Sequence, residues 1–221
     1  CEKGELSWSE TYASLVLALP ADALAALPFE GVAAADRLSV LRGIAHPPVA
    51  SVFTGYKRED MPHPLDGFGV LVPEVEHGKI LGTLFSSTLF PDRAPNGHVA
   101  FTTFVGGTRQ PELLDCDDRM LESVVQGELT RLIGVRAPPA CVHIQRWPRA
   151  IPQYTLGYQR FKDAIAAVEA GASGLFIGGN CRDGISLAYC IDSGRRLAAA
   201  AEDLCGRTNR EQRVASSEHP N

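Results

Sequence analysis

The sequence has no apolar run long enough to cross a membrane as a helix. The longest candidate, residues 13–29, is interrupted by Pro20, Asp22 and Pro28, whereas a spanning helix needs about 20 consecutive apolar residues. An excess of basic residues is also missing, because 21 lysines and arginines stand against 26 aspartates and glutamates. The net charge of −5 argues against nucleic acid as a partner. Peripheral contact with a membrane is left open, and the N-terminal Cys1 also leaves a lipoprotein as a minor alternative.

Metal and disulfide patterns are absent as well. The six cysteines form no C-x-x-C pair and have no zinc spacing. A chain of 221 residues can bury a core without a disulfide framework, so reduced thiols and a cytoplasmic location are expected. The six histidines lack metal-ligand spacing, and Ser186 stands outside a G-x-S-x-G frame. We therefore predict no metal site and no catalytic side chain.

The G-x-G-x-x-G fingerprint of dinucleotide-binding domains does not occur. Gly67-Phe68-Gly69 lacks the third glycine, and a strand-like run follows it. A different glycine loop is present at residues 178–184, between the apolar run Leu175–Ile177 and a helical pattern that begins at Ile185. Such a loop can hold an anion at the helix N-terminus, but an ordinary strand–turn–helix corner has the same pattern.

Hydrophobic periodicity predicts the remaining elements. Strands are predicted at residues 13–19, 49–56, 67–72, 80–85, 99–105, 140–146 and 175–177. Helices are predicted at residues 21–27, 32–41, 118–132, 158–170 and 185–205. No helix of crossover length fits between the strands from 49 to 105, so their sheet should be antiparallel. The polar residues from Gly206 onwards are expected to be disordered.

Six motifs follow one another along most of the chain, from about Ala13 to Leu204. They are Leu65–Pro73, Leu81–Ser87, Phe90–Pro95, Thr103–Gly107, Arg146–Tyr154 and Gly174–Gly194. In this order they resemble the FAD-dependent amine oxidase superfamily and, within it, the protoporphyrinogen oxidases. Several ordered motifs are far more specific than one glycine loop.

The resemblance implies a fold of the α/β plus α+β type. A parallel-sheet remnant of an FAD-binding domain, residues 1–43 and 140–205, would be interrupted by an antiparallel substrate-binding domain, residues 44–139. Residues 206–221 would be the tail. Because the dinucleotide fingerprint is absent, the chain resembles the C-terminal portion of such an enzyme, and the N-terminal FAD-binding half would be its partner. The parallel sheet would then keep an unpaired edge and an uncovered apolar face.

The resemblance also assigns binding residues. The residues expected to lie against FAD are Trp147, Asn180, Gly184, Ile185, Ser186 and Leu187. Those expected to sandwich a tetrapyrrole in an apolar slot are Leu71, Leu84 and Phe104. From the residues alone, these leucines and aromatics are equally well explained as core. The arginines that could pair with substrate carboxylates, or simply be solvated, are Arg109, Arg146 and Arg149.

The implied reaction is the oxygen-dependent, six-electron oxidation of protoporphyrinogen IX to protoporphyrin IX on FAD, in the biosynthesis of haem and chlorophyll. Such an oxidase needs few reactive side chains, because the flavin accepts the hydride. The porphyrinogen and molecular oxygen would be the partners, and a homodimer is left open. The alternatives are a coproporphyrinogen III oxidase, another flavin amine oxidase of the same fold, or an inactive truncated remnant.

Overall fold

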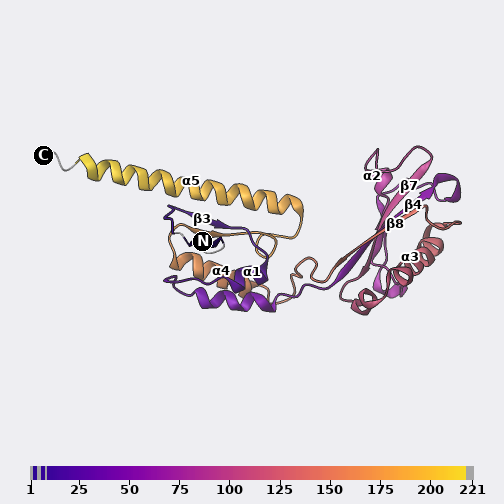
Figure 1. Cartoon of the computed structure of the whole chain (residues 1–221), viewed down its shortest axis with the longest axis horizontal. Coiled ribbons are helices and arrows are strands. Elements are labelled where there is room, and N and C mark those ends of the chain that lie inside the picture. The colour runs from indigo at the N-terminus through magenta and orange to yellow at the C-terminus, as the bar shows by residue number, and fades with distance from the viewer. Residues whose placement is uncertain (1, 4–5, 8, 218–221) are drawn as a thin grey trace. The chain divides into compact units, whose positions relative to one another are not determined.

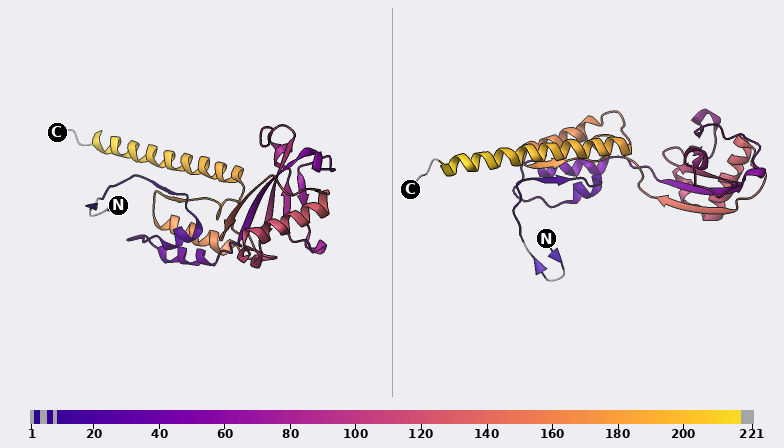
Figure 2. Two further views of the ribbon diagram at one scale, coloured as in Figure 1. Left: turned by 45° about the vertical axis from the view of Figure 1, so that its right-hand side comes forward. Right: turned by 90° about the horizontal axis from the view of Figure 1, so that it is seen from above.

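The chain leaves one compact unit after Ala45 and returns to it at Pro152. In the computed structural model (Figures 1 and 2), residues 2–3, 6–7 and 9–217 are described. Unit 1 consists of residues 1–45 and 152–221, and unit 2 of residues 46–151.

Unit 1 combines short strands with helices. Its strands are β1 Glu2–Lys3, β2 Leu6–Ser7, β3 Leu15–Leu17 and β9 Leu175–Ile177. Its helices are α1 Ala21–Ala26, the 3₁₀ helix η1 Ala35–Gly43, α4 Gln159–Gly171 and α5 Leu187–Ser217. The helical pattern predicted at residues 32–41 therefore takes the tighter 3₁₀ form.

Strands β3 and β9 form a two-stranded parallel sheet, with Leu15 opposite Leu175 and Leu17 opposite Ile177. Helix α5 lies on one side of this pair, and α1 and α4 lie on the other (Figure 1). The side chains that fill the core of unit 1 include Leu24, Leu41, Phe161, Ile165 and Ile177. The pattern of residues 13–19 predicts a buried strand, but Leu15 and Val16 are about half-exposed, so only part of β3 contributes to the core.

The predicted disordered tail is wrong for residues 206–217. Helix α5 continues to Ser217 (Figure 2), and residues 218–221 lie outside the described part of the chain. The sequence Arg210-Glu211-Gln212-Arg213 consists of straight-chain residues, which lose little side-chain freedom in a helix. Their polarity led to the prediction of disorder, but polarity does not prevent a helix from being extended from an existing one.

Unit 2 is built on one five-stranded sheet with the order β5-β6-β7-β4-β8. The strands are β4 Val49–Lys57, β5 Gly69–Leu71, β6 Gly82–Leu84, β7 His98–Gly106 and β8 Cys141–Trp147. The helices are α2 Ser86–Leu89, α3 Asp118–Ile133 and the 3₁₀ turns η2 Arg58–Asp60, η3 Glu74–Glu76 and η4 Pro111–Asp115. All neighbouring strands are antiparallel, which confirms that prediction.

Strand β8 corrects the domain boundary expected after Pro139. It was predicted to return to the FAD-binding part, but it pairs with β4 from Gly55 opposite Cys141 to Val49 opposite Trp147. The boundary therefore falls after Ile151. Strand pairing is a long-range interaction, and the apolar pattern of a strand does not specify which sheet the strand joins.

The sheet of unit 2 has one covered face. Helix α3 packs against it through Leu121, Val125, Leu129 and Ile133, which recur every four residues and so form one stripe. The helix is capped by Asp117, whose side chain accepts a hydrogen bond from the Met120 N–H at 2.8 Å. Alternate residues of the strands, such as Val52, Phe101 and Val105, complete this core.

Candidate functional site

The opposite face of the unit 2 sheet carries the three predicted substrate residues. Directly paired residues of antiparallel strands share a face. Phe104 on β7 pairs with Gly82 on β6, and Gly82 pairs with Leu71 on β5. Leu84 lies two residues after Gly82 and is therefore on the same face. The structure thus brings Leu71, Leu84 and Phe104 together.

Two adjoining hollows open on this face. The first, of about 400 Å³, is lined by Phe68, Leu71, Leu84 and Phe104 among others. The second, of about 550 Å³, is lined by Phe104, Trp147, Arg149 and Ile151 among others. Leu81 and Phe104 border both hollows. The side chains are unusually exposed for their type: Leu71 is 85% exposed, Phe68 68% and Trp147 51%. Large apolar surface of this kind marks a site that binds something.

Gly82 keeps the first hollow open. It lies between Phe104 and Leu71 in the sheet and has no side chain. A Cβ atom at this position would be 2.6 Å from the carbonyl oxygen of Val70 and 3.2 Å from Cδ2 of Leu71. Any larger residue would therefore fill the hollow and push strand β5 away.

The three candidate arginines have different surroundings. Arg146 forms an ion pair with Asp118 at 2.5 Å and donates to the Cys116 carbonyl at 2.7 Å. Arg109 donates to the Val72 carbonyl at 2.9 Å. Arg149 lines the second hollow, with its Nη2 atom 3.1 Å from Nδ1 of His46. Of the three, Arg149 is the one placed to reach a ligand in these hollows.

The other predicted residues, apart from Trp147, lie in unit 1, on the loop between β9 and α5 and at the first residue of α5. Two glycines of this loop have backbone angles that other residues rarely adopt: φ is +108° at Gly179 and +116° at Gly184. A Cβ atom at Gly184 would be 2.7 Å from Cδ2 of Tyr189, whereas one at Gly179 would have only the Leu19 carbonyl oxygen nearby, at 3.8 Å. The space beside Gly179 is therefore open to a close approach.

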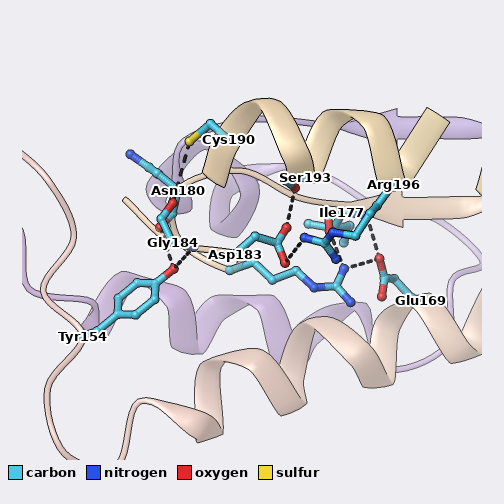
Figure 3. A network of polar contacts seen from close by, with 10 residues as sticks. Tyr154, Glu169, Ile177, Asn180, Asp183, Gly184, Cys190, Ser193 and Arg196 are labelled. Atoms are coloured by element: carbon cyan, nitrogen blue, oxygen red, sulfur yellow. Dashed lines mark hydrogen bonds and ion pairs between the residues drawn. The ribbon is translucent and has the colours of Figure 1, made fainter. Parts of the chain in front are cut away.

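Two carboxylates anchor this loop (Figure 3). Glu169 on α4 accepts hydrogen bonds from the Ile177 N–H at 2.7 Å and from Nη1 of Arg182 at 2.5 Å. Asp183 accepts a hydrogen bond from Ser193 on α5 and forms an ion pair with Arg196 at 3.1 Å. The loop is thus tied to both flanking helices.

Two tyrosines hold the loop from a third direction. The Tyr154 hydroxyl accepts a hydrogen bond from the Gly184 N–H at 3.0 Å and donates one to the Asn180 carbonyl at 2.7 Å (Figure 3). The Tyr158 hydroxyl donates to the Cys181 carbonyl at 2.8 Å. The two rings are stacked with centroids 4.0 Å apart, and burial raises the pKa of both phenols. Sequence reasoning gave neither tyrosine a role, although Tyr154 ends the motif Arg146–Tyr154.

Ser186 caps helix α5. Its Oγ atom accepts a hydrogen bond from the Tyr189 N–H at 3.2 Å, and its carbonyl accepts one from the Cys190 N–H at 3.0 Å. The backbone N–H groups of Leu187 and Ala188, in the first turn, have no acceptor within the helix. Ile185 and Leu187 are exposed beside them. Asn180, Gly184, Ile185 and Ser186 therefore lie on the loop and Leu187 begins α5, whereas Trp147 belongs to unit 2.

Among the residues that the structure describes, no three histidine, cysteine, aspartate or glutamate side chains are grouped as a metal site would require. Within the same residues, no helix is both long and apolar enough to span a membrane.

Comparison with known proteins identifies the family. The model of the family described as flavin containing amine oxidoreductase matches residues 1–201. The chain belongs to this family. The superfamily resemblance drawn from the motifs is thereby confirmed, and the cofactor of the family is a flavin.

Relatives of this chain include plant protoporphyrinogen oxidases. The mitochondrial enzyme of Nicotiana tabacum is 43% identical over 164 residues, which cover 73% of this chain and 32% of that enzyme. Protoporphyrinogen oxidase 2 of Arabidopsis thaliana, chloroplastic/mitochondrial, is 41% identical over 165 residues, with the same coverage. The chain thus spans about a third of the length of these relatives.

Solved structures of the same fold include a candidate protoporphyrinogen oxidase from Exiguobacterium sp. It superimposes with a TM-score of 0.64 at 21% identity, covering 87% of this chain and 40% of that one. Cyclohexylamine oxidase from Brevibacterium oxydans superimposes with a TM-score of 0.54 at 15% identity. The mixture of parallel and antiparallel sheets is therefore that of the amine oxidase fold.

Proposed function

We propose that this chain is part of an FAD-dependent protoporphyrinogen oxidase, in which unit 2 binds the porphyrinogen and unit 1 contributes to the FAD site. The observation that carries the proposal is the apolar sheet face on which Leu71, Leu84 and Phe104 line one hollow. Protoporphyrinogen has a large apolar body, and the burial of such a body supplies most of its affinity. The identity of 41–43% to plant protoporphyrinogen oxidases supports this substrate.

The glycine loop of unit 1 fits a flavin. The open space at Gly179 offers room, the two N–H groups at the start of α5 offer hydrogen-bond donors, and the exposed Ile185 and Leu187 offer apolar contact. Asn180, Gly184, Ile185, Ser186 and Leu187 would lie along the cofactor. Ser186 would act indirectly, because its hydroxyl already caps the helix. The expected contact of Trp147 with FAD stays a prediction; in unit 2 this residue lines the second hollow.

FAD, when bound, supplies a hydride acceptor that oxygen can reoxidise. The residues of this chain would orient the porphyrinogen, exclude water from the apolar slot and hold the loop in place. Because FAD would carry out the redox chemistry and the chain would place the substrate, the described residues that line the two hollows need not include a catalytic acid, base or nucleophile. The lining of both is apolar apart from Arg149 and Thr83.

The test is anaerobic mixing of the whole, FAD-loaded protein with protoporphyrinogen IX. We expect the flavin absorbance to bleach as FAD takes two electrons from the porphyrinogen. When oxygen is admitted, the flavin bands should recover and porphyrin fluorescence should appear, because two further two-electron oxidations are needed to reach the porphyrin. Coproporphyrinogen III is the matched comparison, since the Bacillus subtilis coproporphyrinogen III oxidase is a more distant relative at 25% identity. Faster bleaching with coproporphyrinogen III, or none with either, would contradict the proposal.

Cofactor placement has a separate test in Gly184→Val. A β-branched side chain at φ +116° strains the backbone and meets the Tyr189 ring. We expect the FAD content of the purified protein to fall while the thermal midpoint of unit 2 is kept. Full flavin content in the folded variant would argue against placing FAD at this loop.

A further inference from the structure

The structure assigns a positioning role to Tyr154: its hydroxyl joins the two sides of the glycine loop and so fixes the Asn180 and Gly184 backbone for the cofactor. The inference rests on the proposed function, in which both residues contact FAD. It concerns a residue that lies outside the loop and makes no contact with the cofactor in the proposed site.

The geometry is specific to a phenol. One oxygen atom accepts from the Gly184 N–H at 3.0 Å and donates to the Asn180 carbonyl at 2.7 Å, so it uses both its acceptor and its donor capacity. These two backbone groups are four residues apart on opposite sides of the loop. A phenylalanine would keep the ring but could make neither hydrogen bond.

The ring is itself held in place. It is stacked on Tyr158, with centroids 4.0 Å apart at 29°. Tyr158 is only 6% exposed, and its hydroxyl donates to the Cys181 carbonyl. Tyr158 packs edge-on against Phe161 in the core of unit 1. Tyr154 thus connects the core of unit 1 to the backbone of Asn180 and Gly184.

The contacts made by Asp183 and Glu169 do not replace this link. Asp183 is tied to α5 through Ser193 and Arg196, and Glu169 is tied to the end of β9 and to Arg182. Neither carboxylate bonds to the Asn180 carbonyl or the Gly184 N–H, which Figure 3 shows meeting at the Tyr154 oxygen. Removal of the hydroxyl should therefore loosen one side of the loop and leave the other intact.

The experiment compares Tyr154→Phe with Tyr12→Phe in the whole protein. Tyr12 is an exposed tyrosine of unit 1 that bonds to Glu10 and lies outside this network. Amide hydrogen exchange of the FAD-free protein is measured first. In Tyr154→Phe we expect faster exchange at Gly184, with exchange at Ile177 unchanged because its N–H is bonded to Glu169. Tyr12→Phe should match the wild type. Wild-type exchange at Gly184 in Tyr154→Phe would overturn the inference.

The Kd for FAD is then measured by titration of the same FAD-free samples. Loss of two hydrogen bonds that order the site should weaken FAD binding about tenfold in Tyr154→Phe, with no change in Tyr12→Phe. Suppose that Tyr154→Phe exchanges faster at Gly184 but keeps the wild-type Kd for FAD, while Gly184→Val still weakens FAD binding. That result would overturn the positioning role. If neither Tyr154→Phe nor Gly184→Val affects the Kd, the proposed cofactor placement fails and the positioning role fails with it. The exchange result would still show that the hydroxyl orders the loop.

Discussion

Phe104 on β7 and Leu71 on β5 lie on either side of Gly82 on β6. Because Gly82 has no side chain, the space between the side chains of Phe104 and Leu71 is left unfilled. The missing side chain produces the first hollow on this face of the sheet. A methyl group added at Gly82 should therefore have a measurable effect on the stability of unit 2.

We expect Gly82→Ala to destabilise unit 2 by about 1–3 kcal/mol, because its Cβ would be 2.6 Å from the Val70 carbonyl oxygen and strand β5 would have to shift. Gly127→Ala is the matched control. Gly127 is exposed on α3, and a Cβ there would meet nothing within 4 Å. Alanine should stabilise that helix by about 0.5–1 kcal/mol. Denaturant unfolding of both variants measures the difference, and equal effects would contradict the role of Gly82.

A second prediction separates a substrate slot from a core. Phe104→Ala should weaken porphyrin binding by about 1.5–3 kcal/mol, since an aromatic face stacked on a tetrapyrrole contributes burial and stacking. The control is Phe101→Ala, three residues earlier and on the covered face, where the side chain is fully buried. That change should cost about 3–5 kcal/mol of folding stability.

The two phenylalanine variants differ in which quantity changes. Fluorescence titration with protoporphyrin and thermal unfolding, carried out on the same samples, distinguish them. If Phe104→Ala lowered the thermal midpoint as much as Phe101→Ala and left porphyrin affinity unchanged, Phe104 would be a core residue.

The sequence predicted the strands of unit 2 well because burial alternates along them. Val52 and Tyr56 point to the core and Ser51 points away, as their polarity predicts, whereas Thr54 points inward and Phe53 points away against theirs. The pairing of strands that are distant in the sequence could not be predicted in the same way. Nothing in residues 140–146 specifies that Cys141 lies opposite Gly55 rather than in the parallel sheet.

In the candidate site, too, the residues of the motifs could be selected from the sequence, but their long-range contacts could not. The motif resemblance selected Leu71, Leu84 and Phe104, and the register explains why they meet. The Tyr154 contacts with Asn180 and Gly184 span 26 and 30 residues and leave no periodic signal. They depend on how α4 and β9 pack, and that is decided by the core of unit 1.

A third prediction concerns the carboxylates of the substrate. Arg149→Leu should raise the Kd for protoporphyrin about tenfold but leave the Kd for its dimethyl ester nearly unchanged, because only the diacid can form a charge-assisted pair with the guanidinium. Arg119→Leu, an exposed change on α3, is the control. Equal losses for the diacid and the diester would show that Arg149 contributes packing rather than charge.

The last prediction concerns Tyr56, which anchors the core of unit 2. Its ring is 1% exposed and its hydroxyl donates to Oε1 of Gln126 at 2.7 Å. Burial raises the pKa of Tyr56 to about 12 from an ordinary value of 10. The folded state therefore holds this proton more tightly than the unfolded state. The stabilisation is fully present below pH 10 and is lost as the pH rises from 10 towards 12.

The shift of about two units corresponds to roughly 2.7 kcal/mol. We expect the free energy of unfolding of the wild type to fall by up to that amount across this window, measured by denaturant titration at several alkaline pH values. Tyr56→Phe should be less stable by about 1 kcal/mol at neutral pH, because the hydrogen bond to Gln126 is lost, yet it should fall less steeply above pH 10. The difference between the two proteins should therefore shrink and then reverse. Parallel curves for Tyr56→Phe and the wild type would show that the phenol ionises as readily in the folded as in the unfolded chain.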